Sequence, residues 1–404
     1  MKKITPVLLG ADLNCYSVAR AFHEAYGVVS YAFGKYAIGE TEHSRIVKFC
    51  KTADLGNDKV MLDILLDFAK NHTDEELYLF GCTDEYQEMM IRNQEKLKKY
   101  YFFSCPKREI AEKLISKEAF YGMCEKYDIP YPKTSIFKFG DSFDKLLESN
   151  LGFEYPIILK PSSSIEYWRN PFDGMKKVYL ANDAIEAEKI IFDIYSSGYG
   201  DSVILQEYIS GNEDNMFVVT AYSDKNSAVR MVCMGRVLLG EHTPKGIGNH
   251  VAIITEYHKD MIGRLSNFLE SIGYCGFSNF DIKFDERDNS FKVFEINLRQ
   301  GRSNYYVTAS GNNIADLVVN DRHSSFGDSK KICCKEFFWH TVPKKIIYKY
   351  ISNDDMRKRV QGLVSSKQTS STLFYSHDIR FNFMRSCFVF IHNIRYFRKY
   401  KIYK

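Results

Sequence analysis

The chain has 404 residues, of which 45% are hydrophobic, and 55 Lys and Arg side chains stand against 51 Asp and Glu. Its length and apolar content suffice for a large core in two or three domains and exclude a disordered or low-complexity protein. The formal net charge of +4 is too small to indicate nucleic acid as a partner. No run approaches the roughly 20 apolar residues that a membrane-spanning helix needs.

The cysteines and the start of the chain indicate a cytoplasmic protein. The ten cysteines show no paired metal-ligand spacing, and Cys333 and Cys334 are adjacent, which suits neither a zinc site nor an easy disulfide. Asp12 and Asn14 interrupt the first apolar run too early for a signal peptide. We expect reduced cysteines and a cytoplasmic location, with a peripheral position at the inner face of the membrane as the alternative.

The N-terminal third alternates between predicted strands and predicted helices. Apolar runs at 7–9, 28–31 and 77–80 predict strands, and apolar residues at helical spacing predict helices over 14–26 and around 61–68. This alternation predicts a parallel sheet with crossover helices.

Two polar turns follow predicted strands of this sheet, at 10–14 and 81–84. Ligands of parallel sheets gather beyond the carboxyl ends of the strands. Two interpretations stay open: the turns form part of a substrate wall, or they are purely structural. On the first interpretation, Asn14 and Asp84 are substrate-binding residues.

Three oxygen-bearing side chains lie on two strands predicted at 280–283 and 293–299. Asp281 alternates with apolar neighbours on the first strand, and Glu295 and Asn297 do so on the second, so each strand directs its oxygen atoms away from its apolar face. Carboxylate and amide oxygens suit Mg²⁺, which leaves its remaining positions to water and phosphate. The pattern predicts a magnesium–nucleotide site, and an ordinary surface hairpin is the alternative.

Two lysines and a turn upstream suit the same nucleotide. Lys160 ends a short apolar strand predicted at 156–160, where it can reach a phosphate, and Lys117 begins an amphipathic stretch. Residues 202–211 predict a strand that ends in a turn able to offer backbone groups to an adenine. Each feature alone is also typical of a solvated lysine or an ordinary strand end.

Taken in order, these elements, from about 113 to 320, resemble the ATP-grasp superfamily. The resemblance implies ATP ligands in three groups: Lys117 and Lys160 for the phosphates, Gln206, Glu207 and Ile209 for the adenine, and Glu213 or Asp214 for the ribose. It implies that Asp281, Glu295 and Asn297 hold one or two Mg²⁺ ions, with Mn²⁺ able to substitute. The catalytic residues that it implies are Lys160, Arg299 and Arg302, with Arg299 facing a developing acyl-phosphate.

The sequence departs from the superfamily pattern at one position. Many members place an arginine two residues before the first metal aspartate, where this chain has Asn279. A guanidinium that faces the phosphate must therefore come from another arginine. The candidates are Arg299, Arg230, Arg236 and Arg302.

A closer resemblance covers nearly the whole chain. It is carried by the segments at 6–16, 127–134, 276–283, 294–303 and 342–346, which resemble the D-aspartate ligases of Gram-positive bacteria. The resemblance implies an enzyme of peptidoglycan precursor synthesis. Such an enzyme joins the β-carboxylate of D-aspartate to the lysine ε-amine of the UDP-linked muramyl pentapeptide, through an acyl-phosphate, and releases ADP and phosphate. The alternatives are an ATP-grasp ligase for another carboxylate or amine, and a non-catalytic nucleotide-binding relative.

Two long polar loops are predicted, at 162–177 and 242–250. A lid would protect an acyl-phosphate from water, and an idle surface loop is the alternative for each. The glycines of the second loop favour a place near the substrate carboxylate, and we assign Lys245, Asn249 and His250 to substrate binding. Three side chains are unranked candidates for the base that deprotonates the amine: His242, His250 and Asp84.

Residues 379–404 are basic and aromatic and contain no acidic residue. An amphipathic helix that caps the core is the simpler interpretation, and weak contact with an anionic membrane surface is the alternative.

The whole sequence predicts an α/β (α+β) ATP-grasp fold in three parts. Residues 1–112 form a pre-ATP-grasp domain with a Rossmann-like parallel sheet, 113–325 form the two-part ATP-grasp core, and 326–404 form a small basic helical region. The expected partners are an amino acid and a UDP-linked muramyl peptide, and the oligomeric state stays open.

Overall fold

The computed structural model of the protein describes residues 2–36, 38–243, 246–327 and 330–403. The chain divides into two units. The first comprises Met1–Glu112, Asn212–Ile282 and Ile296–Lys404, and the second comprises Lys113–Gly211 and Lys283–Glu295. The domain boundaries expected after 112 and 325 stay predictions.

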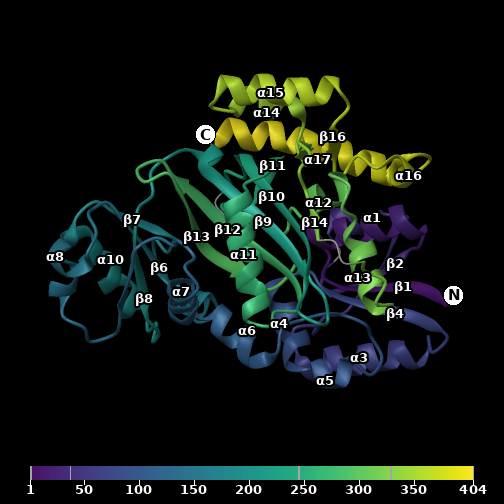
Figure 1. The fold of residues 1–404 in the computed structure, drawn as a ribbon, viewed down its shortest axis with the longest axis horizontal. Helices are drawn as coiled ribbons and strands as arrows, with labels where there is room; N and C mark the ends of the chain where they lie inside the picture. Colours follow the sequence, from purple (N-terminus) through teal and green to yellow (C-terminus); the bar gives the residue numbers. More distant parts are fainter. Residues whose placement is uncertain (1, 37, 244–245, 328–329, 404) are drawn as a thin grey trace. The chain divides into compact units, whose positions relative to one another are not determined.

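A parallel four-stranded sheet forms the N-terminal part of the first unit (Figure 1), which confirms the sheet expected there. Its strands lie in the order β3-β2-β1-β4, and Val7 on the central strand pairs with Tyr31 and Leu79 on its neighbours. The strands are β1 (Lys3–Leu9), β2 (Ser30–Gly34), β3 (Val47–Lys51) and β4 (Glu75–Gly81). The helices are α1 (Leu13–Tyr26), α2 (Gly39–Glu42), α3 (Asp58–Lys70), α4 (Asp84–Arg92), α5 (Gln94–Leu97) and α6 (Arg108–Ile115).

Local sequence signals set the ends of α1. The Asp12 side chain accepts a hydrogen bond from the N–H of Cys15 at 3.2 Å, and Gly27 ends the helix with a φ of 66°. Strand β3 was not predicted, because it is an edge strand in which only Val47 is buried, and its sequence therefore lacks an apolar run.

A second, eight-stranded sheet follows in the order β13-β12-β9-β10-β11-β15-β16, with β14 paired to β10. Its strands are β9 (Met216–Ser223), β10 (Val229–Gly240), β11 (His250–Glu256), β12 (Gly276–Asp285), β13 (Ser290–Asn297), β14 (Lys331–Ile332), β15 (Phe338–His340) and β16 (Thr369–Ser371). Its helices are η2 (Glu213–Asn215), α11 (Lys259–Ser271), α12 (Tyr305–Ala309), α13 (Ile314–Arg322), α14 (Lys344–Tyr350), α15 (Asp354–Ser365), α16 (Ser376–Ile379) and α17 (Phe383–Ile402). The far ends of β12 and β13 belong to the second unit.

The second unit is built on an antiparallel sheet in the order β5-β8-β6-β7. Its elements are α7 (Lys117–Lys126), β5 (Thr134–Phe137), η1 (Phe143–Leu146), α8 (Glu148–Leu151), β6 (Ile157–Pro161), α9 (Ser164–Arg169), β7 (Tyr179–Ala181), α10 (Ala184–Ser196) and β8 (Val203–Glu207). Ile157, Leu159 and Leu205 alternate along β6 and β8 and are fully buried with Ile191 of α10, so one face of the sheet forms the core of this unit.

A buried ion pair joins α17 to α16 and, through Asp378, to the N-terminal sheet region of the first unit. The Arg385 guanidinium lies 3.0 Å from the Asp378 carboxylate, and both side chains are fully buried. Asp378 also accepts from the hydroxyl of Tyr16 at 2.8 Å and from the N–H of Arg45 at 2.6 Å. The expected cap on the core is therefore present.

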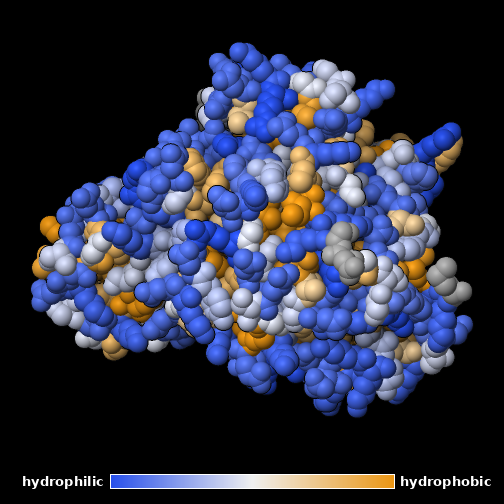
Figure 2. Space-filling view, in the orientation of Figure 1, coloured by the Kyte–Doolittle hydropathy of each residue, from blue (hydrophilic) through white to orange (hydrophobic). Residues whose placement is uncertain are grey.

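The visible surface is mainly hydrophilic, as expected when most apolar residues are buried (Figure 2). Figure 2 shows mainly hydrophilic residues on the visible face, with hydrophobic side chains in small patches. Across the described residues, no helix has both the length and the apolar character to cross a membrane.

Candidate active site

Lys160 ends strand β6 within a network of polar side chains in the second unit. Its Nζ donates to Oε1 of Gln206 at 3.0 Å and lies 3.5 Å from the hydroxyl of Tyr121. The Gln206 amide donates to the hydroxyls of Tyr121 and Thr134, each at 2.9 Å. The Tyr121 hydroxyl donates to the carbonyl of Phe294 at 2.9 Å. Two residues predicted to bind ATP, Lys160 and Gln206, thus lie together.

The charged groups around Lys160 favour the binding of an anion. Burial lowers the pKa of Lys160 to about 7, the charge of Lys117 lowers it further, and Glu295 acts in the opposite direction. Burial also lowers the pKa of Lys117, and Glu295 again opposes this. Because one carboxylate serves two buried lysines, an additional anion such as a phosphate would favour the charged form of both.

Glu207 forms hydrogen bonds and ion pairs with several residues of the second unit. Its N–H donates to the carbonyl of Lys133 at 2.9 Å, and its carboxylate accepts from the Lys133 N–H at 2.8 Å. The same carboxylate lies 3.2 Å from the ammonium of Lys292 and 3.1 Å from the guanidinium of Arg287. Lys292 also pairs with Asp285 at 2.7 Å. These contacts fix the hairpin tip between β12 and β13 onto β8.

The turn after β8 carries a lysine for which the sequence analysis gave no role. Nζ of Lys283 donates to the carbonyl of Ile209 at 2.7 Å and to that of Gly211 at 3.3 Å. Burial lowers the pKa of Lys283, which Asp285 opposes. Ile209 was predicted to present backbone groups to adenine, and Lys283 therefore fixes the carbonyl at that position.

In the first unit, Asp281 and Asn297 lie side by side on β12 and β13. Nδ2 of Asn297 donates to Oδ2 of Asp281 at 3.3 Å and to the carbonyl of Asn279 at 3.4 Å. Nε2 of His250 lies 3.9 Å from Oδ1 of Asp281, whose side chain is 25% exposed. Both predicted metal ligands of this unit are thus adjacent, and His250 lies next to them.

The predicted magnesium ligands are two carboxylates and one amide. They therefore do not amount to a cluster of three His, Cys, Asp or Glu side chains. Within the part of the chain that the structure describes, no group of three or more His, Cys, Asp or Glu side chains is arranged to hold a metal ion.

The four arginines proposed as phosphate ligands differ in their partners. Arg230 pairs with Asp224 at 2.6 Å, and Arg236 pairs with Glu256 at 3.1 Å. Arg299 lies 2.8 Å from the carboxylate of Asp84. Nη1 of Arg302 is buried and has no hydrogen-bond partner among the described residues. Arg302 is thus the candidate with spare hydrogen-bonding capacity.

Asn14 lies in the interior of the first unit rather than on a wall. Its Nδ2 donates to the carbonyls of Cys82 at 2.7 Å and Gln300 at 3.2 Å, and its Oδ1 accepts from Asn304 at 2.8 Å. The side chain is fully buried. Asn14 therefore holds the segment after β13 against the end of β4, which positions Arg299 and Arg302 without requiring that Asn14 touch a substrate.

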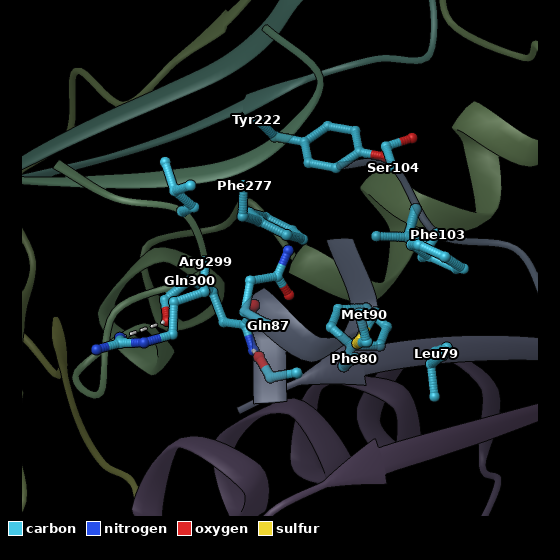
Figure 3. Close-up of a pocket in the computed structure, with 13 residues that line it drawn as sticks. Leu79, Phe80, Gln87, Met90, Phe103, Ser104, Tyr222, Phe277, Arg299 and Gln300 are labelled. Carbon is cyan, nitrogen blue, oxygen red and sulfur yellow. Dashed lines mark hydrogen bonds between the residues drawn. The ribbon is translucent and has the colours of Figure 1, made fainter. Parts of the chain in front are cut away.

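A small cavity borders this junction (Figure 3). Its 13 lining residues include Gly81, Gln87, Arg299 and Gln300, and its volume of about 20 Å³ suits a single water molecule. Gly81 has no room for a side chain, because an added Cβ would lie 2.8 Å from the backbone of Gln87. The close approach that Gly81 permits places the start of α4, and with it Asp84, beside Arg299.

The remaining predicted residues have varied surroundings. Glu213 accepts from the N–H of Gly240 and contacts Nε2 of His242, each at 2.9 Å, while the carbonyl of Asp214 accepts from Arg236 at 3.2 Å. The choice between Glu213 and Asp214 for the ribose stays open. Lys245 lies outside the described residues.

Sequence reasoning missed Tyr121, Lys283 and Lys292. Tyr121 lies next to Phe120 in the stretch predicted as amphipathic, and its hydroxyl could not be assigned a partner without the fold. The two lysines stand on the strands that carry the metal motif, in Phe-Asp-Ile-Lys283 and in Lys292-Val-Phe-Glu, and their spacing from that motif was the available signal.

Comparison with solved structures places the fold. The structure matches an L-amino acid ligase from Bacillus licheniformis with a TM-score of 0.56 and 12% identity, over 81% of this chain and 77% of that one. It matches the biotin carboxylase domain of the Hydrogenobacter thermophilus 2-oxoglutarate carboxylase, solved with MgADP, with a TM-score of 0.60 and 14% identity, over 82% and 72% of the two chains.

Comparison with curated sequences is more specific. The chain is 36% identical over 387 residues to the D-aspartate ligase of Enterococcus faecium (strain Aus0004), covering 93% of this chain and 91% of that protein. It is 25% identical over 198 residues to the carbamoyl phosphate synthase large chain of Pyrococcus furiosus, which covers 48% of this chain and 17% of that protein. No family model matches the sequence.

The fold and the similarity to a D-aspartate ligase define an ATP-grasp carboxylate–amine ligase, a class of enzyme that uses ATP and Mg²⁺. Within that class the similarity over 93% of the chain is decisive. The protein belongs to the D-aspartate ligase family.

Proposed function

We propose that the protein joins the β-carboxylate of D-aspartate to the lysine ε-amine of a UDP-linked muramyl pentapeptide, with ADP and phosphate as the other products. The observation that carries the proposal is the 36% identity to a D-aspartate ligase along nearly the full length of both chains. The reaction passes through an acyl-phosphate, because lysines suited to the terminal phosphates accompany a magnesium motif.

Asp281, Glu295 and Asn297 are the proposed ligands of Mg²⁺. Asp281 and Asn297 fit this role, because Asn297 uses its N–H groups toward Asp281 and Asn279 and so turns its amide oxygen away from those partners. Glu295 precedes Asn297 by two residues on β13 and shares its side of the strand. When bound, the ion would neutralise phosphate oxygens as their charge increases.

The lysines and arginines have separate tasks in the proposed reaction. Lys117 and Lys160 bind the phosphates and offset the repulsion between the attacking carboxylate and the terminal phosphate. Arg302 has an unpaired buried N–H to offer the substrate, and Arg299 is oriented by Asp84. No covalent protein intermediate is needed. The base that deprotonates the amine stays open among His242, His250 and Asp84.

The test is a product analysis with purified enzyme, Mg-ATP, the lysine-containing acceptor and each enantiomer of aspartate. We expect ADP, phosphate and an acceptor heavier by one aspartyl residue, with D-aspartate and not with L-aspartate. AMP and pyrophosphate would overturn the acyl-phosphate. A mass gain only with a neutral or basic amino acid would overturn the choice of substrate and favour a ligase for another carboxylate. ATP binding without turnover of any amino acid would favour a non-catalytic relative.

A further inference from the structure

A pocket of about 430 Å³ lies in the first unit, where α17 meets three other segments. The segments are the start of α2, residues 241–243 and 246–249 between β10 and β11, and the residues after β13. The charged and polar residues that line it and matter here are Glu40, Asn249, Arg302, His392, Arg395 and Lys399. Three of these six come from α17, a helix that the sequence analysis treated only as a cap or a membrane contact.

Two arginines that line this pocket have hydrogen-bonding groups to spare. Arg302 has a buried Nη1 without a hydrogen-bond partner among the described residues. Arg395 is exposed, and no hydrogen bond or ion pair joins it to any part of the chain that the structure describes. The third cation, Lys399, is already neutralised by Glu241 at 2.8 Å. Buried polar groups without partners require an explanation, and a ligand is one.

Besides the ion pair of Lys399 and Glu241, the carboxyl group of Glu40 and the imidazole of His392 line the pocket. Burial raises the pKa of Glu40, and the charge of Arg302 opposes this. Burial lowers the pKa of His392 to about 4, so its ring is neutral near pH 7, and its buried Nδ1 has no partner in the described chain. The groups with hydrogen-bonding capacity to spare are therefore two guanidinium ions, the carboxyl group of Glu40 and Nδ1 of a neutral imidazole.

This pocket adjoins the candidate metal ligands of the same unit. Asn249 lines the pocket, and the next residue, His250, lies 3.9 Å from Asp281. On another side, Arg302 and Arg299 both act on the buried carboxyl group of Asp12. A small molecule held in the pocket would thus lie beside the residues to which we assign the reaction.

We propose that this pocket binds the amino-acid substrate by its non-reacting end, with Arg302 and Arg395 holding the α-carboxylate and Glu40 the α-ammonium. An acidic amino acid presents one carboxylate for reaction and a second carboxylate and an ammonium for recognition. The guanidinium ions and the carboxyl group of the pocket complement that non-reacting end. The inference rests on the proposed function and adds that α17 is part of the substrate site.

Arg395→Met tests the proposal, with Arg398→Met as the matched control. Arg398 is an exposed arginine on the same helix that lines a different hollow, beside Lys345 and Lys401. We expect Arg395→Met to raise the KM for D-aspartate roughly 10- to 100-fold with little change in kcat, because a charge-assisted hydrogen bond to the unreacting end is lost from substrate and transition state alike. Arg398→Met should leave both constants unchanged.

Truncated substrates test separately which group binds the α-carboxylate and which binds the α-ammonium. β-Alanine keeps the reacting carboxylate and the amine of aspartate but lacks the α-carboxylate, so the wild-type preference for D-aspartate over β-alanine should collapse in Arg395→Met. Succinate lacks the amine, so Glu40→Gln should erase the preference for D-aspartate over succinate. Each variant should keep its discrimination at the other group.

The outcomes separate this inference from the proposed function. If the wild-type enzyme converts no acidic amino acid, the proposed function fails and takes the inference with it. If the wild-type enzyme converts D-aspartate and Arg395→Met behaves like Arg398→Met, the inference alone is overturned. A rise in the KM of the muramyl acceptor, with that of D-aspartate unchanged, would also overturn it and assign the pocket to the acceptor.

Discussion

Lys160 shows how a single residue links the fold to the chemistry. The residue ends β6, where burial and the charge of Lys117 lower its pKa to about 7. The sequence indicated a lysine near a phosphate, but it could not reveal that the ammonium is only partly charged at neutral pH in the unliganded enzyme. That property depends on how deeply the fold buries the side chain and on the nearby charge of Lys117.

A pH dependence of ATP binding follows. Below about pH 7 Lys160 is protonated before ATP arrives, whereas above it the neutral amine must take up a proton on binding, because phosphate favours the charged form. We therefore expect the Kd for Mg-ATP to rise with pH above about 7, by at most about tenfold per pH unit. Calorimetry in buffers of different ionisation enthalpy should record proton uptake. Lys160→Arg should lose this dependence, and an equal pH profile in both proteins would contradict the assignment.

Glu295 carries the second prediction at this scale. Glu295→Gln removes a charge from the proposed magnesium site, and we expect turnover to fall by roughly a hundredfold or more with the fold retained. Glu188→Gln is a suitable control, because Glu188 is an exposed residue of α10 in the same unit. Steady-state kinetics at saturating Mg²⁺ is the measurement, and wild-type rates for Glu295→Gln would remove Glu295 from the site.

At the scale of elements, α17 has an inner and an outer side. Val389, Tyr396 and Tyr400 are buried against the first unit, whereas Phe390 and Phe397 are 66% and 44% exposed. The Tyr396 hydroxyl donates to Glu241 at 2.7 Å, which ties the helix to the loop after β10. The sequence was compatible with a cap or a membrane contact, and the structure shows the inner side packed as a cap.

The ion pair of Arg385 and Asp378 should dominate the attachment of α17. Arg385→Met leaves a buried carboxylate without its cation, and we expect a loss of about 3–5 kcal/mol in the free energy of unfolding of the first unit. Urea denaturation followed by tyrosine and tryptophan fluorescence measures it, and Arg398→Met serves as the control on the exposed side. A loss below about 1 kcal/mol would show that the hydrogen bonds to Asp378 suffice alone.

At the scale of the whole molecule, the outer side of α17 leads to a prediction about location. Exposed Phe390 and Phe397 stand among basic residues such as Arg398 and Lys401. We expect binding to vesicles that contain anionic phospholipid, weakened by salt, because each basic residue near such a surface contributes about 1 kcal/mol. Replacing Phe390 and Phe397 with Ser should abolish flotation with vesicles and preserve activity, whereas Phe192→Ser should change neither. If the wild-type protein does not float with the vesicles, the predicted membrane contact is wrong.

The fold class could be predicted from sequence because it depends on periodicity. The apolar runs at 7–9 and 77–80 lie within β1 and β4 as observed. The site was less predictable, since a motif does not show where a side chain's hydrogen bonds go. For Asn14 the sequence left open a substrate wall or a structural turn, and it did not show the hydrogen bonds of Asn14 with Gln300 and Asn304 or the buried N–H of Arg302 that has no partner among the described residues. These differences arise from contacts between residues almost 300 positions apart, which no local pattern encodes.

The ion pair that anchors α17 also has a consequence for synthesis of the chain. The Tyr16 hydroxyl and the Asp378 carboxylate that it contacts are separated by 362 positions. A ribosome must therefore finish almost the whole chain before the first helix acquires its last partners. The contacts that offset the entropic cost of closing so long a loop form only then. The N-terminal sheet region consequently lacks this contact through most of translation. A chain that terminates early, before residue 378, would leave that region open to the proteases that remove unfinished proteins.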